Sequence, residues 1–247
     1  AKEMSDVSMP IGVDTTPPNC SPITINNNNP GQGMQYTEET SRLNASWTCV
    51  DAAPWEGRPL SCRWAVGSFP GGEDLMPFRM ASQNGRHMFE CGGCLENGLI
   101  YYVSLECTDQ VGLSRFVTSG GLMPDLTVPE PAIPATVVTR FTGRATTFWG
   151  SGSDISLLYG FDDLESGIKS VRAAFSHSMT SFISGPTDIA GFLAMPIELP
   201  VGDGQSHAVA ELAQQGLTLQ HGAYYSVHVC AEDWMDHVVC SAPYAFL

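Results

Sequence analysis

One segment of this chain occurs twice, and its two copies keep a constant offset of 124 residues. They read Leu95-x-x-Gly98-x-x-Tyr101-x-Val103-x-Leu105-x-Cys107-x-Asp109 and Leu219-x-x-Gly222-x-x-Tyr225-x-Val227-x-Val229-x-Ala231-x-Asp233. Because apolar residues stand at every second position after the tyrosine, each copy predicts a strand with one buried face. The segment before each strand is typical of a corner between two sheets, where a tyrosine hydroxyl satisfies a backbone group.

Earlier segments of the two halves also match. Leu43-x-Ala45-x-Trp47-x-Cys49 aligns with Ile155-x-Leu157-x-Tyr159-x-Phe161, and Cys62-x-Trp64-x-Val66 aligns with Val171-x-Ala173-x-Phe175. The offsets of these pairs are 112 and 109 residues, so the loops differ in length while the strands persist. A Gly/Pro/Ser-rich insertion over 176–204 is predicted to be a surface loop of the second copy. The chain therefore reads as two copies of one all-β module.

Proline-rich junctions precede both copies, at 13–18 and at 125–131. Such segments are stiff and lack amide donors, which is typical of linkers. Residues 8–12 also resemble residues 120–124, so we expect the parent protein to be a longer array. The predicted domains are 1–13, the tail of a preceding repeat plus linker, then 14–125 and 126–247.

Composition and motifs exclude several functions. The 11 lysines and arginines stand against 26 acidic residues, and the formal net charge of −15 makes nucleic acid an improbable partner. No run of 18 apolar residues is present, so we expect no membrane insertion. Serine-hydrolase, zinc-helix and phosphate-loop motifs are absent, so we expect no enzyme activity, catalytic residue or cofactor. Cys91-Gly92-Gly93-Cys94 has redox spacing but follows a strand, whereas redox dithiols open helices.

The cysteines and sequons predict an oxidising compartment. The number of cysteines is even, at eight, and none has zinc-site spacing. The sequons Asn19-Cys20-Ser21 and Asn44-Ala45-Ser46 are predicted glycosylation sites at Asn19 and Asn44. We therefore expect an extracellular glycoprotein with disulfide bonds.

Two other residue groups leave alternatives open. Acidic groups at the predicted module ends suit a calcium contact, but solvated turn residues are the favoured interpretation, so no metal ligand is assigned. They are Asp51, Glu56 and Asp109 in the first copy, and Asp162-Asp163-x-Glu165 and Glu232-Asp233-x-x-Asp236 in the second. Predicted loops contain Trp55, Trp149 and Trp234, which either stack on glycan or on a partner protein, or cap the domain ends.

These features resemble a known family. The repeated tyrosine segment and the early-strand tryptophan are similar to fibronectin type III repeats. Asp14-Thr15-Thr16-Pro17-Pro18 and Trp64-Ala65-Val66-Gly67-Ser68 resemble tandem Ig-like/fibronectin-like repeats of large algal or protist extracellular proteins, of flagellar-hair (mastigoneme) or gamete-adhesion type. The second copy departs from the first by Tyr159 in place of Trp47. The resemblance implies two tandem sandwiches, each with strands A, B and E facing C, C′, F and G.

The resemblance also implies how the cysteines pair. It places Cys20, Cys49, Cys62 and Cys107 at one end of the first sandwich, with Cys49–Cys62 and Cys20–Cys107 preferred and Cys62–Cys107 as the rival. Cys91 and Cys94 fall at the other end, where they pair with each other or stay free. A hairpin turning near Met235 brings Cys230 opposite Cys240. Buried free thiols are the alternative for all eight.

The resulting functional hypothesis is that the chain is a non-catalytic structural module of a multi-repeat surface or filament protein. One such protein would be that of the hairs on a flagellum (cilium). Its predicted partners are neighbouring repeats and other protein chains, with glycan or calcium contact left open. The alternative is a cell-surface adhesion receptor module for cell–cell or gamete recognition. A third hypothesis is a glycan-binding accessory module. Fold alone does not choose among them.

Overall fold

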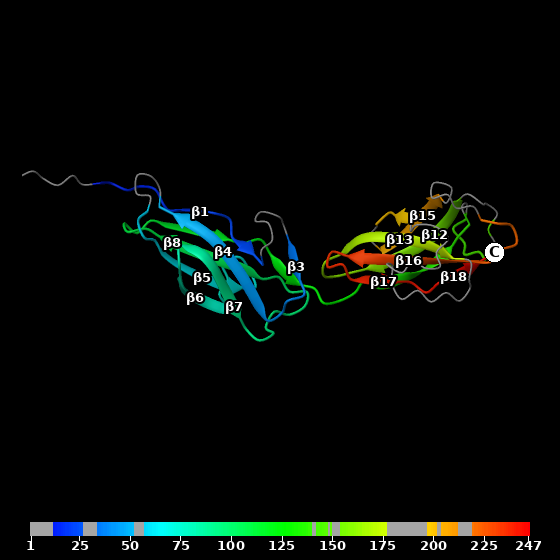
Figure 1. The fold of residues 1–247 in the computed structure, drawn as a ribbon, viewed down its shortest axis with the longest axis horizontal. Coiled ribbons are helices and arrows are strands. Elements are labelled where there is room, and N and C mark those ends of the chain that lie inside the picture. Colours follow the sequence, from blue (N-terminus) through cyan, green and yellow to red (C-terminus); the bar gives the residue numbers. More distant parts are fainter. Residues whose placement is uncertain are drawn as a thin grey trace, which may run out of the picture. The chain divides into compact units, whose positions relative to one another are not determined.

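The structure, a computed structural model, describes residues 12–26, 34–51, 57–139, 142–147, 149, 154–176, 197–201, 204–211 and 219–247. Every regular element in these ranges is a strand. The strands form two compact units (Figure 1), Ala1–Gln35 with Glu39–Leu122 and Tyr36–Glu38 with Met123–Leu247. The predicted all-β class is confirmed. No helix long and apolar enough to cross a membrane occurs among the described residues.

The first unit contains two main sheets. In one, β1 (Asn19–Cys20) and β2 (Thr24–Ile25) pair with successive parts of β4 (Arg42–Val50), whose other edge pairs with β7 (Asn84–Glu90). The other has the order β6 (Met76–Ala81), β5 (Ser61–Gly67), β8 (Tyr102–Thr108), β9 (Ser114–Thr118). β3 (Gln35–Thr37) pairs with β10 (Leu122–Pro124). These are the A-B-E and C′-C-F-G sheets that the resemblance implies.

The second unit repeats this order. One sheet is β11 (Glu130–Val137), β12 (Asp154–Asp162), β15 (Gly204–Glu211), and the other is β14 (Ile197–Leu199), β13 (Ile168–Ser176), β16 (Tyr225–Asp233). β17 (Val238–Cys240) and β18 (Tyr244–Phe246) both pair with β16, so the last strand is split. Most of the predicted insertion, 177–196, lies outside the described residues. Its final part is not all loop, because it includes β14.

The strand alternation builds both cores. In the first module the inward residues of β4 pack against those of β5 and β8, and the Trp47 and Trp64 rings lie 5.8 Å apart. In the second, Tyr159 takes the place of Trp47 and donates its hydroxyl to the Pro200 carbonyl at 2.7 Å. Burial raises the pKa of Tyr159 to about 12, so the hydroxyl stays protonated and able to donate. The predicted buried strands are thus confirmed in both modules.

The repeated tyrosines make the predicted corner. Tyr101 accepts a hydrogen bond from the Glu96 amide at 2.8 Å, and Tyr225 accepts one from the Gln220 amide at 2.7 Å. The glycine of each corner adopts a positive φ, 74° at Gly98 and 76° at Gly222, which explains why glycine stands there.

Removing either corner hydroxyl tests this arrangement. We expect Tyr101→Phe and Tyr225→Phe each to lower the free energy of unfolding by about 1–3 kcal/mol, because a backbone amide loses its buried acceptor. Denaturant unfolding followed by circular dichroism measures the loss. Tyr224→Phe is the matched control, since Tyr224 is adjacent to Tyr225 but exposed. An equal loss in the control would contradict a specific role for the corner.

Candidate functional site

All eight cysteines form disulfides in the structure. Cys230 pairs with Cys240 across the β16–β17 hairpin, where the two residues stand opposite in register. Cys91 pairs with Cys94 in the turn after β7. The Cys230–Cys240 bond is the one predicted, and the Cys91–Cys94 bond is one of the two alternatives that the sequence left open for that pair.

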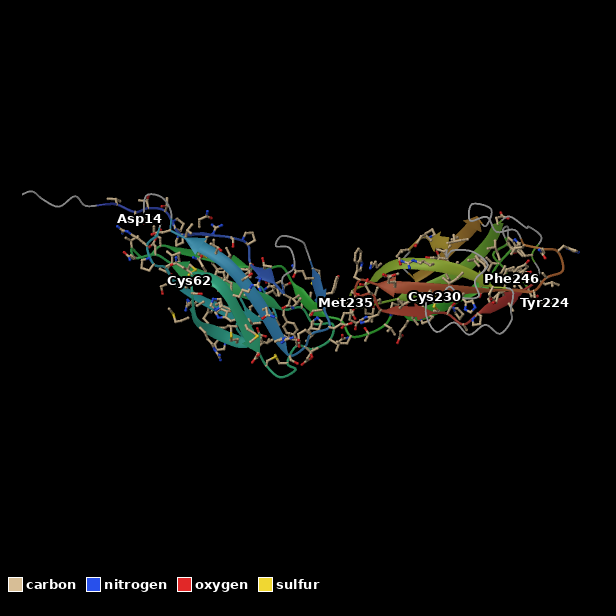
Figure 2. All side chains as sticks on the ribbon, viewed as in Figure 1. Asp14, Cys62, Tyr224, Cys230, Met235 and Phe246 are labelled. Carbon is tan, nitrogen blue, oxygen red and sulfur yellow. A yellow bond between two sulfur atoms is a disulfide. The ribbon has the colours of Figure 1, made fainter. Side chains whose placement is uncertain are left out.

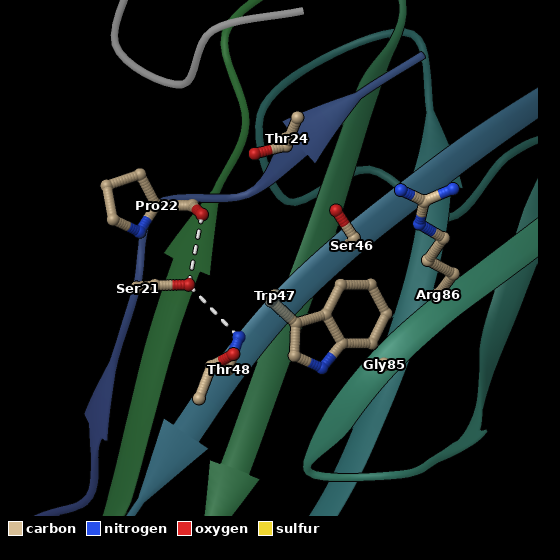
Figure 3. Close-up of a pocket in the computed structure, with 8 residues that line it drawn as sticks. All are labelled: Ser21, Pro22, Thr24, Ser46, Trp47, Thr48, Gly85 and Arg86. Carbon is tan, nitrogen blue, oxygen red and sulfur yellow. Dashed lines mark hydrogen bonds between the residues drawn. The ribbon is translucent and has the colours of Figure 1, made fainter. Parts of the chain in front are cut away.

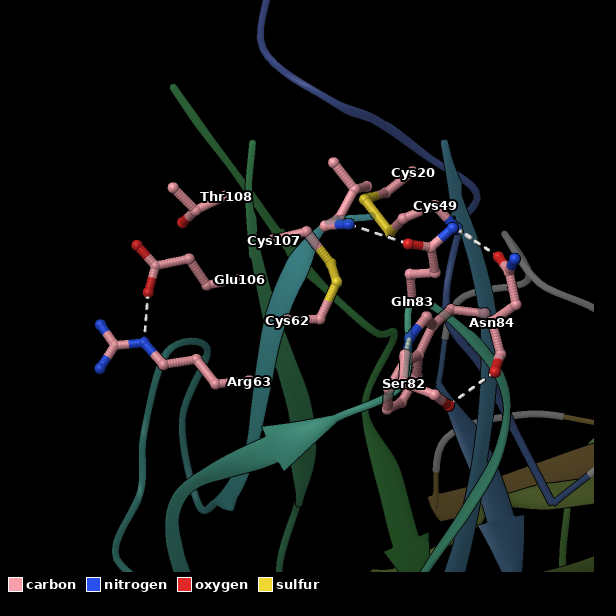
Figure 4. Close-up of a disulfide and its surroundings, with 12 residues drawn as sticks. Cys20, Cys49, Cys62, Arg63, Ser82, Gln83, Asn84, Glu106, Cys107 and Thr108 are labelled. Carbon is pink, nitrogen blue, oxygen red and sulfur yellow. Dashed lines mark hydrogen bonds and ion pairs between the residues drawn. A yellow bond between two sulfur atoms is a disulfide. The ribbon is translucent and has the colours of Figure 1, made fainter. Parts of the chain in front are cut away.

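The preferred pairing of the other four cysteines is wrong. Cys20 bonds to Cys49 and Cys62 bonds to Cys107, the second bond being the predicted rival (Figure 4). Each bond joins neighbouring strands of one sheet, because Cys20 stands opposite Cys49 and Cys62 opposite Cys107 in register. Cys49 and Cys62 both point into the core as expected, but they belong to different sheets and bond within their own.

The Cys62–Cys107 bond is expected to be a large contributor to the stability of the first module. It closes a loop with a sequence separation of 45 residues, so Cys62→Val with Cys107→Ala should cost about 4 kcal/mol of unfolding free energy. Valine and alanine fill the matching core positions of the second module, Val171 and Ala231. Cys91→Ala with Cys94→Ala, with a separation of only 3, is the control and should cost about 2 kcal/mol in the same denaturant titration. A larger loss in the control would contradict the loop-closure argument.

The predicted glycosylation residues both lie on the sheet formed by β1, β2, β4 and β7. Asn19 is exposed on β1, and Asn44 is half-buried on β4. An open depression of about 360 Å³ lies over the same sheet (Figure 3). It is lined by Ser21, Pro22, Thr24, Ser46, Trp47, Thr48, Gly85 and Arg86. Trp47 belongs to the core and is only 3% exposed, so the depression offers no aromatic surface on which a sugar could stack.

The two loop tryptophans that the structure describes, Trp149 and Trp234, give no common aromatic surface either. Trp149 packs against the second core and donates its Nε1–H to the Asp154 carbonyl at 2.6 Å. Trp234 is exposed, and Trp55 lies outside the described residues. Among the described tryptophans, Trp149 fits the predicted role of a domain-end cap.

One serine–histidine contact has the residue types of a nucleophile and its base. Ser82 Oγ lies 3.0 Å from His87 Nε2, and burial lowers the pKa of His87. Ser82, however, also donates its hydroxyl hydrogen to the Asn84 carbonyl at 2.6 Å, and the imidazole stacks on Trp47 with ring centroids 4.6 Å apart. A serine that has given its only hydrogen to a carbonyl is not activated by a base. The contact therefore holds the turn before β7.

Three aspartates gather at one end of the first module. Carboxylate oxygens of Asp14, Asp51 and Asp109 lie within 4.8 Å of one another. Asp109 Oδ1 accepts hydrogen bonds from the amides of Val111 and Leu113, both at 2.9 Å. Asp109 is 7% exposed, and its Oδ2 is buried without a hydrogen-bond partner among the described residues. One oxygen of this carboxylate therefore holds the loop through hydrogen bonds, and the other belongs to the acidic cluster and accepts no hydrogen bond from the described residues.

The second module has a corresponding cluster of Asp125, Asp163 and Glu165, again within 4.8 Å. Asp125 Oδ1 accepts from the amide and hydroxyl of Thr127, at 3.1 and 3.2 Å. Asp163 Oδ1 accepts from the amides of Glu165 and Ser166, at 2.9 and 3.1 Å. Asp125 is 0% exposed, and the Oδ2 atoms of both aspartates are buried without a hydrogen-bond partner in the described part of the chain.

A histidine adjoins this second cluster. Asp125 also groups with Asp233 and His237 within 4.8 Å. Asp233 Oδ1 accepts from the amides of Met235 and His237, at 2.7 and 2.9 Å, and its Oδ2 lies 2.8 Å from His237 Nδ1. Figure 2 labels Met235 at the end of the second module opposite Tyr224 and Phe246. Burial lowers the pKa of His237, but hydrogen bonding and charge from Asp233 outweigh burial and raise it above the usual value.

The clusters occupy matching sequence positions. Two residues after the last apolar inward residue of β4 stands Asp51, and Asp163 has the same place after that of β12. In the same way, Asp109 follows the last apolar inward residue of β8 and Asp233 that of β16. Asp14 holds Thr16 through the same two hydrogen bonds, 3.1 and 3.2 Å, by which Asp125 holds Thr127. The duplication therefore extends to the carboxylates.

The interpretation of these acids as solvated turn residues is wrong for Asp51, Asp109 and Asp233, which are buried. It holds for the exposed Asp236, which pairs with Lys169, whereas Glu56 lies outside the described residues. Sequence reasoning missed Asp14 and Asp125, because both stand in segments interpreted as linkers. The available signal was the same Asp-x-Thr at both junctions.

Crowding acids in this way has an electrostatic cost. Two unit charges about 5 Å apart repel by about 3 kcal/mol at an effective dielectric constant of about 20. Burial adds a desolvation cost for every oxygen without a donor. Chemically, the clusters offer hard oxygen ligands for a cation rather than an acid–base pair aimed at a substrate.

No family model matches the sequence, and no curated protein matches it. Among solved structures, the chain is similar to the chicken CNTN1 FN1–FN3 domains, with 14% identity, a TM-score of 0.41 and coverage of 96% of this chain and 69% of that one. It is also similar to the Clostridium thermocellum CbhA fibronectin(III)-like modules, with 11% identity, a TM-score of 0.38 and 91% coverage of each chain. A third is the Dpr2 Ig1–Ig2 complex with DIP-Theta Ig1–Ig3, with 10% identity, a TM-score of 0.25 and coverage of 90% and 97%.

Proposed function

We propose that this chain is a non-catalytic, extracellular structural part of a multi-repeat surface or filament protein, acting through packing against other protein chains. The observation that carries the proposal is the duplicated sandwich in which all eight cysteines are disulfide-bonded. Disulfides persist in oxidising compartments, which supports a position outside the cytosol. Two copies of one rigid module suit a repeating scaffold better than a single binding cleft. A flagellar hair is the specific assembly proposed, on the resemblance of the sequence.

An outward row on the first module supplies a surface for such packing. Met80 on β6, Arg63 on β5, Glu106 on β8 and Phe116 on β9 stand side by side in register. The Arg63 guanidinium pairs with Glu106 at 2.6 Å in the middle, and the apolar residues at the two edges are 73% and 49% exposed. Exposed apolar side chains on either side of a neutralised charge pair suit contact with another protein surface.

Sedimentation velocity tests this surface. We expect the purified chain to self-associate at high micromolar concentration, and Met80→Lys with Phe116→Lys to abolish the association by placing charge on both sides of the row. The matched control is Met88→Lys, an exposed methionine on β7 of the other sheet, which should leave association unchanged. A wild-type chain that stays monomeric at every concentration would contradict self-packing and favour the alternative, an adhesion receptor module for cell–cell or gamete recognition.

The location is tested separately on native cells. We expect immunogold label from an antibody to the folded chain to repeat along an external filament, because an array of modules presents the epitope at intervals. Label restricted to the plasma membrane or a mating structure would favour the adhesion module. Cytosolic label would contradict both, since the disulfides would then lie in a reducing compartment. Pre-absorbing the antibody with the purified chain controls for specificity.

A further inference from the structure

We propose that each module binds one Ca²⁺ ion in its acidic cluster, through Asp14, Asp51 and Asp109 in the first and Asp125, Asp163 and Glu165 in the second. This inference adds a ligand to the proposed structural role. It concerns the purified chain alone, so its failure would leave the proposed function standing.

The first argument is that the two oxygens of each carboxylate differ in their hydrogen-bond partners. In Asp109, Asp125 and Asp163, Oδ1 accepts two hydrogen bonds from the local turn, which fixes the carboxylate. The Oδ2 of each is buried and accepts none within the described residues. Buried polar atoms in folded proteins are almost always satisfied. Three such oxygens in two equivalent clusters indicate a missing positive partner.

The second argument is that the histidine beside the second cluster, His237, already has partners for both of its ring nitrogens. The His237 ring approaches Asp125, but its Nδ1 lies 2.8 Å from Asp233 and its Nε2 lies 3.2 Å from Glu38. Both nitrogens therefore contact other carboxylates and cannot satisfy the Asp125 and Asp163 oxygens. A bound cation would oppose the mutual repulsion of the three acids directly.

The third argument selects Ca²⁺ among cations. The free atoms are carboxylate oxygens, the hard ligands that Ca²⁺ and Mg²⁺ prefer, whereas zinc prefers nitrogen and sulfur. The acids of the first cluster come from three separate segments, and those of the second come from two, since Asp163 and Glu165 share the loop after β12. Ca²⁺ accepts six to eight ligands in irregular geometry, while Mg²⁺ demands a near-ideal octahedron and retains its waters. The sulfur group Cys20, Cys49 and Cys107 is excluded, since these atoms are already in disulfides.

Calorimetric titration of Ca²⁺ into the chelator-treated full chain tests the proposal. We expect two ions per chain, falling to one in Asp163→Asn and to one in Asp109→Asn. Asparagine keeps an oxygen that can accept the turn amides, so each variant removes the charge while preserving the fold. Asp162→Asn is the control, because it changes the same charge at the neighbouring but exposed position and should still bind two. Failure of wild type to bind Ca²⁺ would overturn the proposal.

Thermal unfolding supplies a second readout that a purely structural role would not give. Ca²⁺ should raise the unfolding midpoint of wild type by several degrees, because it binds only the folded modules. In chelator, Asp163→Asn should be as stable as wild type or more stable, since it relieves repulsion. A variant that is equally destabilised with and without Ca²⁺ would show that the aspartates only hold their turns, and would overturn the proposal.

Two further measurements keep the test decisive. An equal shift from NaCl at matched ionic strength would assign the effect to charge screening and overturn the site; an equal shift from Mg²⁺ would overturn the selection of Ca²⁺. If Asp163→Asn fails to fold by near-ultraviolet circular dichroism, Glu165→Gln takes its place, with the same loss of one ion expected. Unchanged binding in that folded variant would contradict the assignment of the second cluster.

Discussion

The rest of this structure depends on apolar contact between two sheets whose central strands alternate strictly between inward and outward residues. Because the period of a strand is two, a one-residue slip would turn the whole inward set to the solvent, so the contact fixes register as well as packing. In the first module this set includes Leu43, Trp47 and Val103, all buried. The edge strands and the corner are then built onto a sandwich whose layers are already specified.

The two modules fill the same interior in different ways. The first places Cys49, Cys62 and Cys107 where the second has Phe161, Val171 and Ala231. The disulfides therefore occupy core positions as well as cross-linking strands, and they draw stability from chain entropy where the second module uses apolar volume. The Cys230–Cys240 bond of the second module instead closes an edge hairpin. The two similar sandwiches are thus cross-linked at different places, the first within its core and the second at an edge hairpin.

The sequence was enough to predict the features that depend on periodicity, which are the central strands and the corner. It was not enough where a prediction required knowing which strands lie side by side in a sheet. The alternation located the central strands, and the spacing of Gly98 and Tyr101 located the corner, because both signals are local. The pairing of Cys49 failed because it depends on which strands share a sheet: β1 lies beside β4, so Cys20 is nearer than Cys62. The role of Asp125 was missed because its proline-rich surroundings indicate only a linker. The acids that it meets, Asp163 and Glu165, are distant in the sequence.

The same alternation accounts for the acidic clusters. Asp51 follows Cys49 by two residues and Asp109 follows Cys107 by two, so each side chain continues the inward face one step beyond the core. Asp163 and Asp233 do the same after Phe161 and Ala231. The parity of the strand turns a carboxylate at that step inward, so that Asp51, Asp109 and Asp233 are buried and Asp163 is half-buried. An apolar residue there would simply lengthen the core. Carboxylates at these positions in both modules indicate that charge is required at this end of each sandwich, and an oxygen-preferring cation satisfies that requirement at both.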